Sequence, residues 1–154
     1  MELNVYTDWW CIKNPWGKWA YCFYIVETKE FWFWISESTT NNVMELSAIK
    51  GATDYIINTS FIVPSLQVNY HSDSQYALWV ISGTMKPSVS RDLIRNIQTA
   101  MHEFEDVSFN RVKAHWDNPY NIFCDEVCTI LMKWENPESY ISRFLELIDN
   151  YTTS

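Results

Sequence analysis

The chain has 154 residues, of which 47% are hydrophobic and 19% charged, an ordinary composition for a globular domain. No stretch approaches the roughly 18 consecutive apolar residues of a membrane helix, and the first residues lack the positive charge of a signal peptide. These features exclude a membrane helix, and we expect a soluble, cytoplasmic protein with a single domain over residues 1–154.

The net charge is −8 at pH 7, and nine Trp residues stand against only three Gly. Most nucleic-acid-binding proteins are basic, because Lys and Arg contacts to phosphates supply much of their affinity. If the partner is a polyanion, either bound Mg²⁺ offsets the carboxylates locally or the affinity is weak and sensitive to salt.

The beginning of the chain is rich in aromatic and β-branched residues, which predicts three strands. We expect them at Leu3–Trp10, Trp19–Glu27 and Glu30–Ser36. A polar break at Thr28-Lys29 separates the last two, which favours a hairpin.

A helix is expected next, because residues 39–42 (Thr-Thr-Asn-Asn) offer hydroxyl and amide groups suited to capping it. Its apolar face follows at helical spacing, with Leu46, Ile49, Thr53 and Ile56.

The rest of the chain alternates short strands with helices. Strands are expected at Leu66–Tyr70 and Val107–Lys113. Either Ser72 or Ser74 would cap a helix that ends at Gly83. Three further helices are expected. One begins at Ser90, and the other two cover Asn118–Trp134 and Pro137–Tyr151.

The predicted order is therefore β-β-β-α-β-α-α-β-α-α. Three strands in a row imply an antiparallel portion, and the later alternation implies parallel pairing with helices on both faces. The sequence predicts an α/β fold with a five-stranded mixed sheet and an extra C-terminal helix at about 137–151.

The four cysteines show no C-x-x-C spacing. Cys124 and Cys128 are four residues apart, which places them on one face of a helix. We interpret the cysteines as buried, reduced thiols, since a metal-binding pair has little support.

Four carboxylates stand in four well-marked contexts. Asp8 ends V-Y-T-D, Glu45 lies in T-T-N-N-V-M-E-L, Asp73 in H-S-D-S-Q-Y and Asp125 in F-C-D-E. Scattered acids at strand ends and helix starts are how a small α/β fold builds a two-metal phosphodiester site, with the ions about 4 Å apart.

These motifs resemble those of type 1 ribonuclease H, the endonuclease that cuts the RNA strand of an RNA–DNA hybrid. Y-T-D-x-x-C with a later N-P resembles the first strand and its turn, and T-T-N-N-x-M-E-L resembles the start of the first helix. S-D-S-Q-Y resembles the end of the fourth strand, and V-K-x-H with Asn121 and Cys124-Asp125 resembles the last strand, loop and helix. The resemblance covers residues 3–132 and implies a ribonuclease-H-like sheet.

The resemblance also implies roles for the acids. Asp8 would bridge two Mg²⁺ ions, with Mn²⁺ as an alternative metal, and Asp73 would hold the ion that activates water. Glu45 and Asp125 would hold the ion on the leaving-group side, and the products would carry 5′-phosphate and 3′-hydroxyl ends. His115 matches a loop histidine that assists proton transfer or product release, although a plain surface histidine is the alternative.

Six further residues match family positions that touch the backbone and 2′-hydroxyls of the hybrid. They are Cys11, Asn14, Asn41, Asn42, Gln75 and Asn121. Selection of RNA through its 2′-hydroxyl is a general mode of RNA recognition. For Asn41 and Asn42, helix capping alone is the alternative.

Trp9-Trp10 stands where the family has Gly-Ser, and Trp16 stands where it continues with glycines. The family's K-G-H-x-G becomes K-A-H-W-D here, with Trp116 in place of the variable residue. Glycine permits close approach of a backbone to a ligand, so an indole beside Asp8 would block or reshape the groove. Three interpretations stay open: packing in a core or interface, stacking platforms for unpaired bases, or occlusion of the site of a former enzyme.

A second departure lies between Trp79 and Arg91, where many family members insert a basic helix and loop that grips the substrate. Here residues 81–90 intervene, with Lys86 as their one cation. This predicts weak intrinsic affinity for a hybrid or dependence on a partner.

The run Phe31-Trp32-Phe33-Trp34 is unusual. In a strand, one pair of these aromatics faces the core and the other faces outward. Outward rings at Trp32 and Trp34 would be covered by the C-terminal helix or would form a surface for a protein partner or a homodimer.

We therefore expect a Mg²⁺- or Mn²⁺-dependent enzyme that cuts RNA in RNA–DNA hybrids. One alternative is a catalytically weak or inactive module of the same fold that binds nucleic acid or protein. Another is a different nuclease of the wider superfamily.

Overall fold

The computed structural model describes residues 1–11, 19–36, 41–112, 118–133, 142–143, 145–147 and 149–150. The strands are β1 (Glu2–Cys11), β2 (Trp19–Ile25), β3 (Glu30–Ser36), β4 (Gln67–Ser72) and β5 (Asp106–Arg111). The helices are α1 (Asn41–Thr59), α2 (Gln75–Ser82), α3 (Arg91–Met101) and α4 (Pro119–Lys133), with a short 3-10 helix at Val63–Ser65. From β1 to α4 the predicted order of strands and α-helices is confirmed.

The strands form a five-stranded sheet in the order β3-β2-β1-β4-β5. β1 pairs antiparallel with β2 and β2 with β3, whereas β1 pairs parallel with β4 and β4 with β5. The predicted α/β fold with a mixed sheet is therefore confirmed. The central strand β1, which carries Asp8, has both a parallel and an antiparallel neighbour.

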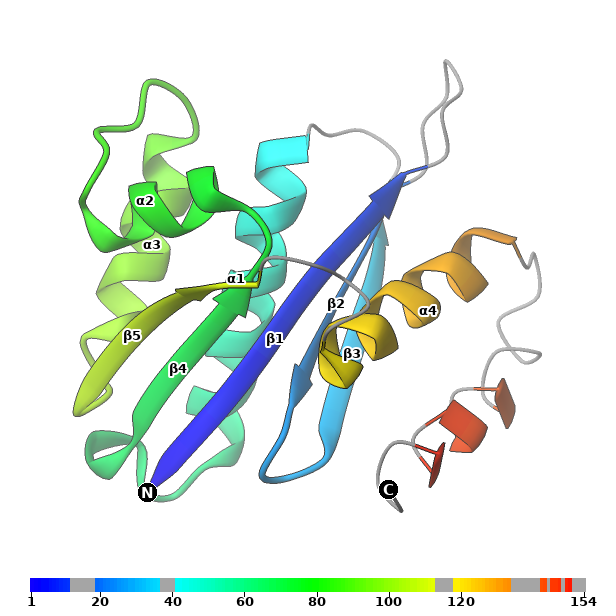
Figure 1. The fold of residues 1–154 in the computed structure, drawn as a ribbon. Helices are drawn as coiled ribbons and strands as arrows, with labels where there is room; N and C mark the ends of the chain where they lie inside the picture. Colours follow the sequence, from blue (N-terminus) through cyan, green and yellow to red (C-terminus); the bar gives the residue numbers. More distant parts are fainter. Residues whose placement is uncertain are drawn as a thin grey trace.

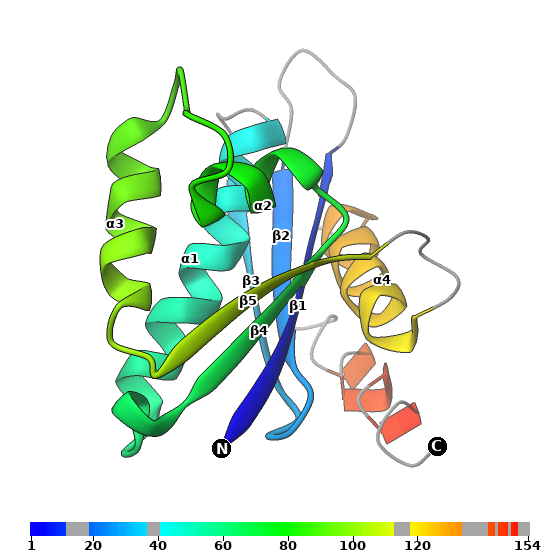
Figure 2. The ribbon, with the colours of Figure 1, turned by 60° about the vertical axis from the view of Figure 1, so that its left-hand side comes forward.

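Helices cover the two faces of the sheet unequally. α1, α2 and α3 lie on one face, and α4 lies on the other (Figures 1 and 2). The larger apolar core lies beneath the three helices and includes Val5, Ile49 and Ile97. A smaller core lies between the sheet and α4 and includes Tyr24 and Val127.

Local sequence signals explain where α2 begins and ends. The Ser74 hydroxyl accepts a hydrogen bond from the Ala77 backbone N–H at 3.2 Å, so Ser74 rather than Ser72 is the N-cap. Gly83 follows the last turn with a φ of 83°, a left-handed conformation that glycine adopts without steric cost.

All strands except β3 begin or end one or two residues away from the prediction, and the largest shifts are at the ends of β2, β4 and β5. β2 ends at Ile25 because residues 26–29 form the hairpin turn, in which Lys29 has a φ of 56°. β4 continues to Ser72, pairing with Arg111 of β5 at that end. The longer β4 brings the end of the sheet directly to Asp73.

Most of the predicted C-terminal helix at about 137–151 lies outside the described residues. Those that are described, at 142–143, 145–147 and 149–150, are helical. Leu147 among them is buried in the core beneath α4. Among the described helices, none is long and apolar enough to cross a membrane.

The aromatic residues of β3 divide between the two faces. Phe31 and Phe33 pack against the core beneath α4, whereas Trp34 packs against the larger core on the opposite face. The expectation that Trp34 faces outward is wrong, because α1 covers it at Gly51. Trp32 is 52% exposed, and its place in a homodimer or partner surface stays a prediction.

Candidate active site

Three of the four predicted acids come together at one end of the central strands. Asp8 comes from β1, Glu45 from the second turn of α1, and Asp73 from the junction between β4 and α2. One carboxylate oxygen of each lies within 4.8 Å of the corresponding oxygen of the other two. Residues 65 positions apart in sequence thus form one acidic cluster.

Burial makes this cluster electrostatically unfavourable in its fully ionised form. Asp8 and Glu45 are each only 2% exposed. Loss of solvation raises the pKa of Asp8 well above its usual value, and the charges of Asp73 and Asp125 raise it further. Burial likewise raises the pKa of Glu45, followed by the charges of Asp73 and Asp8. A bound cation would relieve this repulsion.

Asp125 lies on α4, on the opposite side of β1 from α1. It is outside the cluster of three, but its charge acts on Asp8. Its position on a separate helix means that the distance between Asp8 and Asp125 depends on how α4 packs against β1.

Two buried thiols fix that packing. The Sγ of Cys124 donates to the Tyr6 carbonyl at 3.7 Å, and the Sγ of Cys128 donates to the Asp8 carbonyl at 3.9 Å. Cys22, Cys124 and Cys128 are buried and free, as predicted, and burial raises the pKa of each. Protonated thiols with raised pKa values act here as packing groups and weak donors.

The start of α4 is held by Asn118. Its Oδ1 accepts hydrogen bonds from the backbone N–H groups of Tyr120 and Asn121 at 2.9 and 3.2 Å, and its Nδ2 donates to the Tyr6 hydroxyl at 3.1 Å. The Tyr6 ring stacks on His71 of β4, with ring centroids 4.4 Å apart. The helix that carries Asp125 is thereby tied to β1 and β4.

Hydrogen bonds also orient individual carboxylates. The Trp9 backbone N–H donates to Asp8 Oδ1 at 2.9 Å. The Ser72 hydroxyl donates to Glu45 Oε2 at 3.2 Å, and this contact is buried. Both bonds favour the ionised carboxylate and fix one of its oxygens.

The remaining predicted site residues have different outcomes. Gln75 begins α2, two residues after Asp73, and is partly buried. Asn121 is fully buried, which argues against direct contact with a nucleic acid. His115 and Asn14 lie outside the described residues, as do the side chains of Cys11, Asn41 and Asn42.

Trp9 is packed against another indole. Its ring centroid lies 5.4 Å from that of Trp19 on β2, and both residues are partly buried. Tyr21 on the same strand stacks on Trp34 at 5.0 Å. The contacts of Trp9 favour the packing interpretation. Trp16, Trp116 and the side chain of Trp10 lie outside the described residues.

The acidic cluster fits a divalent cation of the hard, oxygen-binding kind. All its donors are carboxylate oxygens, which Mg²⁺ and Mn²⁺ prefer. Glu45 Oε1 is buried and accepts no hydrogen bond within the described part of the chain. A buried acceptor without a donor is costly, and coordination of a cation would satisfy it.

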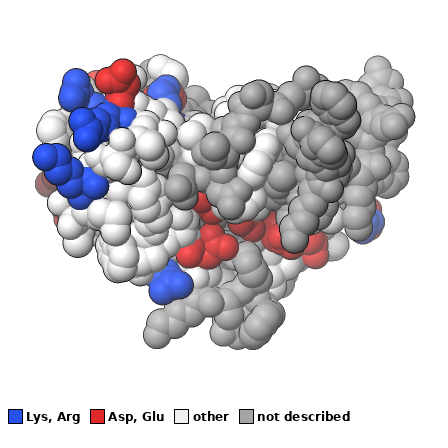
Figure 3. Space-filling view, turned by 90° about the horizontal axis from the view of Figure 1, so that it is seen from above, with Lys and Arg blue, Asp and Glu red and all other residues white. Residues whose placement is uncertain are grey.

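The surface around the acids has a marked division of charge. Figure 3 shows Asp and Glu side chains at the centre of this face and Lys and Arg side chains gathered at its left. Three cations, Lys86, Arg91 and Arg95, line a hollow of about 400 Å³ between α2 and α3. No carboxylate from the described residues lines this hollow.

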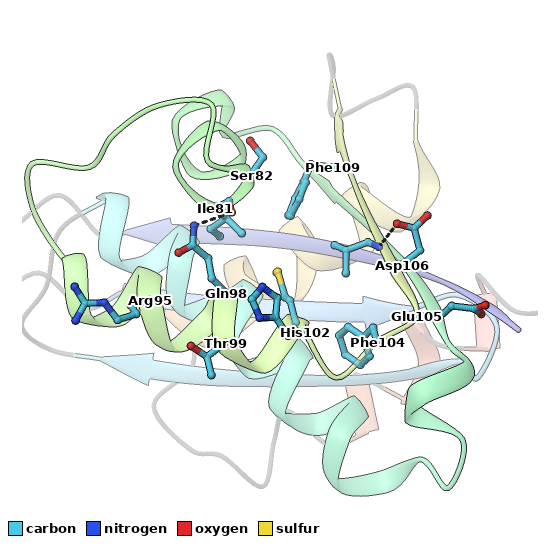
Figure 4. A pocket seen from close by; sticks show the side chains of 12 residues that line it. Ile81, Ser82, Arg95, Gln98, Thr99, His102, Phe104, Glu105, Asp106 and Phe109 are labelled. Carbon is cyan, nitrogen blue, oxygen red and sulfur yellow. Dashed lines mark hydrogen bonds between the residues drawn. The ribbon is translucent and has the colours of Figure 1, made fainter.

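A separate hollow of about 680 Å³ lies between α2, α3 and β5 (Figure 4). Arg95 and Gln98 line both hollows, and the Gln98 amide donates to the Ile81 carbonyl at 3.0 Å. Glu105 and Asp106 are among its lining residues, so it is less positive than its neighbour. None of the four predicted acids lines it.

Sequence reasoning missed the contact of Ser72 with Glu45. It also missed the hollow lined by Lys86, Arg91 and Arg95, which we call the basic hollow. The sequence presents Ser72 only as a candidate helix cap, and nothing local links it to a glutamate 27 residues earlier. Arg91 and Arg95 had a weak signal, because residues four apart share one face of a helix, next to Lys86.

Comparison with known proteins agrees with this geometry. Residues 1–130 match the model of the RNase H family. A ribonuclease H of Chlorobium phaeobacteroides is 36% identical over 150 residues, covering 86% of this chain and 96% of that protein. A ribonuclease H of Thermoanaerobacter sp. is 30% identical over 146 residues, covering 85% and 90%.

Solved structures share the fold. RNase H1 of the archaeon Halobacterium salinarum has a TM-score of 0.64 at 18% identity, covering 82% of this chain and 93% of that one. LC11-RNase H1, solved in complex with an RNA/DNA hybrid, has a TM-score of 0.69 at 19% identity, covering 85% and 99%. By its sequence and its fold, the chain therefore belongs to the RNase H family of ribonucleases.

Proposed function

We propose that the chain is an endoribonuclease that hydrolyses the RNA strand of RNA–DNA hybrids with two divalent metal ions. The observation that carries this proposal is the gathering of Asp8, Glu45 and Asp73 from three separate elements within 4.8 Å of one another. Membership in the RNase H family and the fold shared with a hybrid-bound neighbour support the choice of substrate.

In the proposed reaction, Asp8, Glu45, Asp73 and Asp125 hold the metal ions. When bound, two divalent ions activate a water molecule and stabilise the leaving oxygen of a phosphodiester. Mg²⁺ is the proposed physiological ion, with Mn²⁺ as a substitute. The proposed products carry 5′-phosphate and 3′-hydroxyl ends.

The chain's own residues prepare the site for this chemistry. The Trp9 N–H holds one carboxylate oxygen of Asp8 in place, and the Ser72 hydroxyl holds one carboxylate oxygen of Glu45. Burial of these two acids excludes water that would otherwise screen their charge. Their side chains are thus positioned before a ligand arrives.

The basic hollow supports binding of a polyanion despite the net charge of −8. Lys86, Arg91 and Arg95 contribute three positive charges in one place on a chain with 11 Lys and Arg in total. We infer that phosphates of the hybrid contact this region. Affinity would then fall as salt concentration rises.

Cleavage of an end-labelled RNA–DNA hybrid in Mg²⁺, Mn²⁺ or EDTA tests the proposal, with Asp73→Asn as the matched variant. We expect metal-dependent cutting of the RNA strand alone, absent in the variant. Asp73→Asn removes a charge without creating a core cavity, so its fold should persist. Cleavage by thoroughly purified Asp73→Asn would refute the assignment.

One specific observation favours a second candidate, a binding module with little or no catalytic activity. Trp9, the residue after Asp8 on β1, packs at a tilt on Trp19 of β2, and neither indole is fully buried. A hybrid bound in EDTA but not cut in either metal would favour this candidate.

A further inference from the structure

Ser72 occupies a junction between the elements that carry the acids. It is the last residue of β4, it directly precedes Asp73, and its side chain is fully buried. Its carbonyl accepts a hydrogen bond from the Val112 N–H at 2.9 Å, at the end of β5. The backbone on which the Ser72 hydroxyl stands is therefore fixed.

The hydroxyl has two partners with opposite roles. The Ser74 backbone N–H donates to Ser72 Oγ at 3.1 Å, and Ser72 Oγ in turn donates to Glu45 Oε2 at 3.2 Å. Because a hydroxyl has one hydrogen and the Ser74 N–H supplies its own, the Ser72 hydrogen is left for the carboxylate.

The two carboxylate oxygens of Glu45 therefore differ in their hydrogen bonds. Oε2 is engaged by Ser72, whereas Oε1 is buried and accepts no hydrogen bond in the described part of the chain. Glu45 stands on α1, and Ser72 stands on β4, so this contact also links the two elements that bring Glu45 to Asp73.

We propose that Ser72 is a positioning residue, whose hydroxyl holds Glu45 Oε2 so that Oε1 is presented to a divalent cation. The inference rests on the proposed function, in which these acids bind metal. Ser72 itself touches neither cation nor substrate. Groups that orient metal-binding side chains in this way influence affinity strongly, and their loss typically weakens binding about 10–100-fold.

A purely structural role makes a different prediction. If Ser72 only stabilised the start of α2 through Ser74, its removal would lower the melting temperature and leave metal affinity unchanged. The two roles are therefore separated by measuring metal binding and thermal stability on the same variants, without any nucleic acid present.

The experiment is titration calorimetry of Mn²⁺ into the purified full chain and into Ser72→Ala. We expect affinity for Mn²⁺ to fall by about tenfold or more in Ser72→Ala, and Ser72→Thr, which keeps the hydroxyl, to restore most of it. Ser74→Ala is the matched control, since it removes the cap of α2 without touching Glu45. It should lower thermal stability and leave Mn²⁺ affinity within about twofold, a small effect beside that expected of Ser72→Ala.

If Ser72→Ala fails to fold, Ser72→Cys replaces it, because a thiol has a similar shape and is a much weaker donor. Equal Mn²⁺ affinity in the wild-type chain and in the folded variant would overturn the inference while leaving the proposed function intact. Absence of Mn²⁺ binding by the wild-type chain would overturn the proposed function itself, and the inference with it.

Discussion

The indole of Trp34 lies directly over Gly51 of α1. A Cβ atom at position 51 would come within 2.7 Å of both Cη2 and Cζ3 of the Trp34 ring. Trp34 also stacks on Tyr21 and contacts Phe23, so the ring has little room to move aside. The glycine is what lets the edge strand β3 pack its tryptophan against α1.

This contact predicts that Gly51→Ala destabilises the protein. An Ala in place of Gly within a helix normally adds about 1 kcal/mol of stability, but overpacking a filled site costs about 1–3 kcal/mol. Urea unfolding should show a net loss for Gly51→Ala in the wild-type chain. In a Trp34→Leu background the same change should stabilise, and a loss of equal size in both backgrounds would refute the packing account.

Neutralising Asp8 should stabilise the metal-free protein at neutral pH. The pKa of this carboxyl is raised by burial and by neighbouring charges. Such a group stabilises the fold below its unfolded pKa, and that contribution is lost as pH rises through the raised pKa. We therefore expect metal-free Asp8→Asn to melt a few degrees above the wild-type chain at neutral pH, where about 1 kcal/mol corresponds to roughly 2–4 °C.

The melting temperatures of the wild-type chain and of Asp8→Asn should also be compared at lower pH and with a control variant. The advantage of Asp8→Asn should shrink as the pH is lowered, because the wild-type carboxyl then becomes neutral. Asp54→Asn removes a more exposed charge that pairs with Lys50 at 2.6 Å, and it should give no such gain. A lower melting point for metal-free Asp8→Asn would show that burial of Asp8 is not a strain on the fold.

Trp9→Gly should lower stability without raising cleavage. Because the Trp9 ring packs on Trp19, its removal should cost about 1–3 kcal/mol, less than for a fully buried tryptophan. Trp32→Gly on the exposed part of β3 is the control and should cost less. A several-fold faster cleavage of hybrid by Trp9→Gly would instead show that the indole obstructs the substrate.

The basic hollow should determine the salt dependence of hybrid binding. Arg91→Gln and Arg95→Gln remove charges that line it, so each should weaken binding in low salt and reduce the slope of log affinity against log salt by about 1. Fluorescence anisotropy in Ca²⁺ or EDTA measures this without cleavage. Lys50→Gln, whose charge is already paired with Asp54, should leave the slope nearly unchanged.

The sequence was informative where local chemistry decides the structure. Ser74 and Gly83 limit α2 through capping and a left-handed turn, and both could be recognised directly. The meeting of Asp8, Glu45 and Asp73 was expected from motifs that resemble a known family, since nothing in their spacing alone brings acids 65 positions apart into one cluster.

Contacts between distant elements could not be read in the same way. A run of four aromatics in β3 alternates between faces, but alternation does not tell where a helix covers a face. α1 covers Trp34, which the sequence predicts to face outward. The link from Ser72 to Glu45 depends on the crossing of α1 and β4. Arg91 and Arg95 belong to α3, and only the packing of α3 against α2 places them with Lys86 around one hollow.

The two sulfur contacts of α4 have a consequence for the fourth acid. Cys124 and Cys128 are one helical turn apart, about 6 Å, and they meet carbonyls two residues apart on β1, a separation of about 6–7 Å. The spacing of the two sulfur atoms along α4 thus matches the spacing of the two carbonyl groups along β1. The sulfur atoms set the distance between the helix and the strand. The distance from Asp125 to Asp8 therefore depends on the size of the buried side chains of Cys124 and Cys128. A bulkier residue at either position would push α4, and Asp125 with it, away from β1 while leaving all four carboxylates in the sequence unchanged.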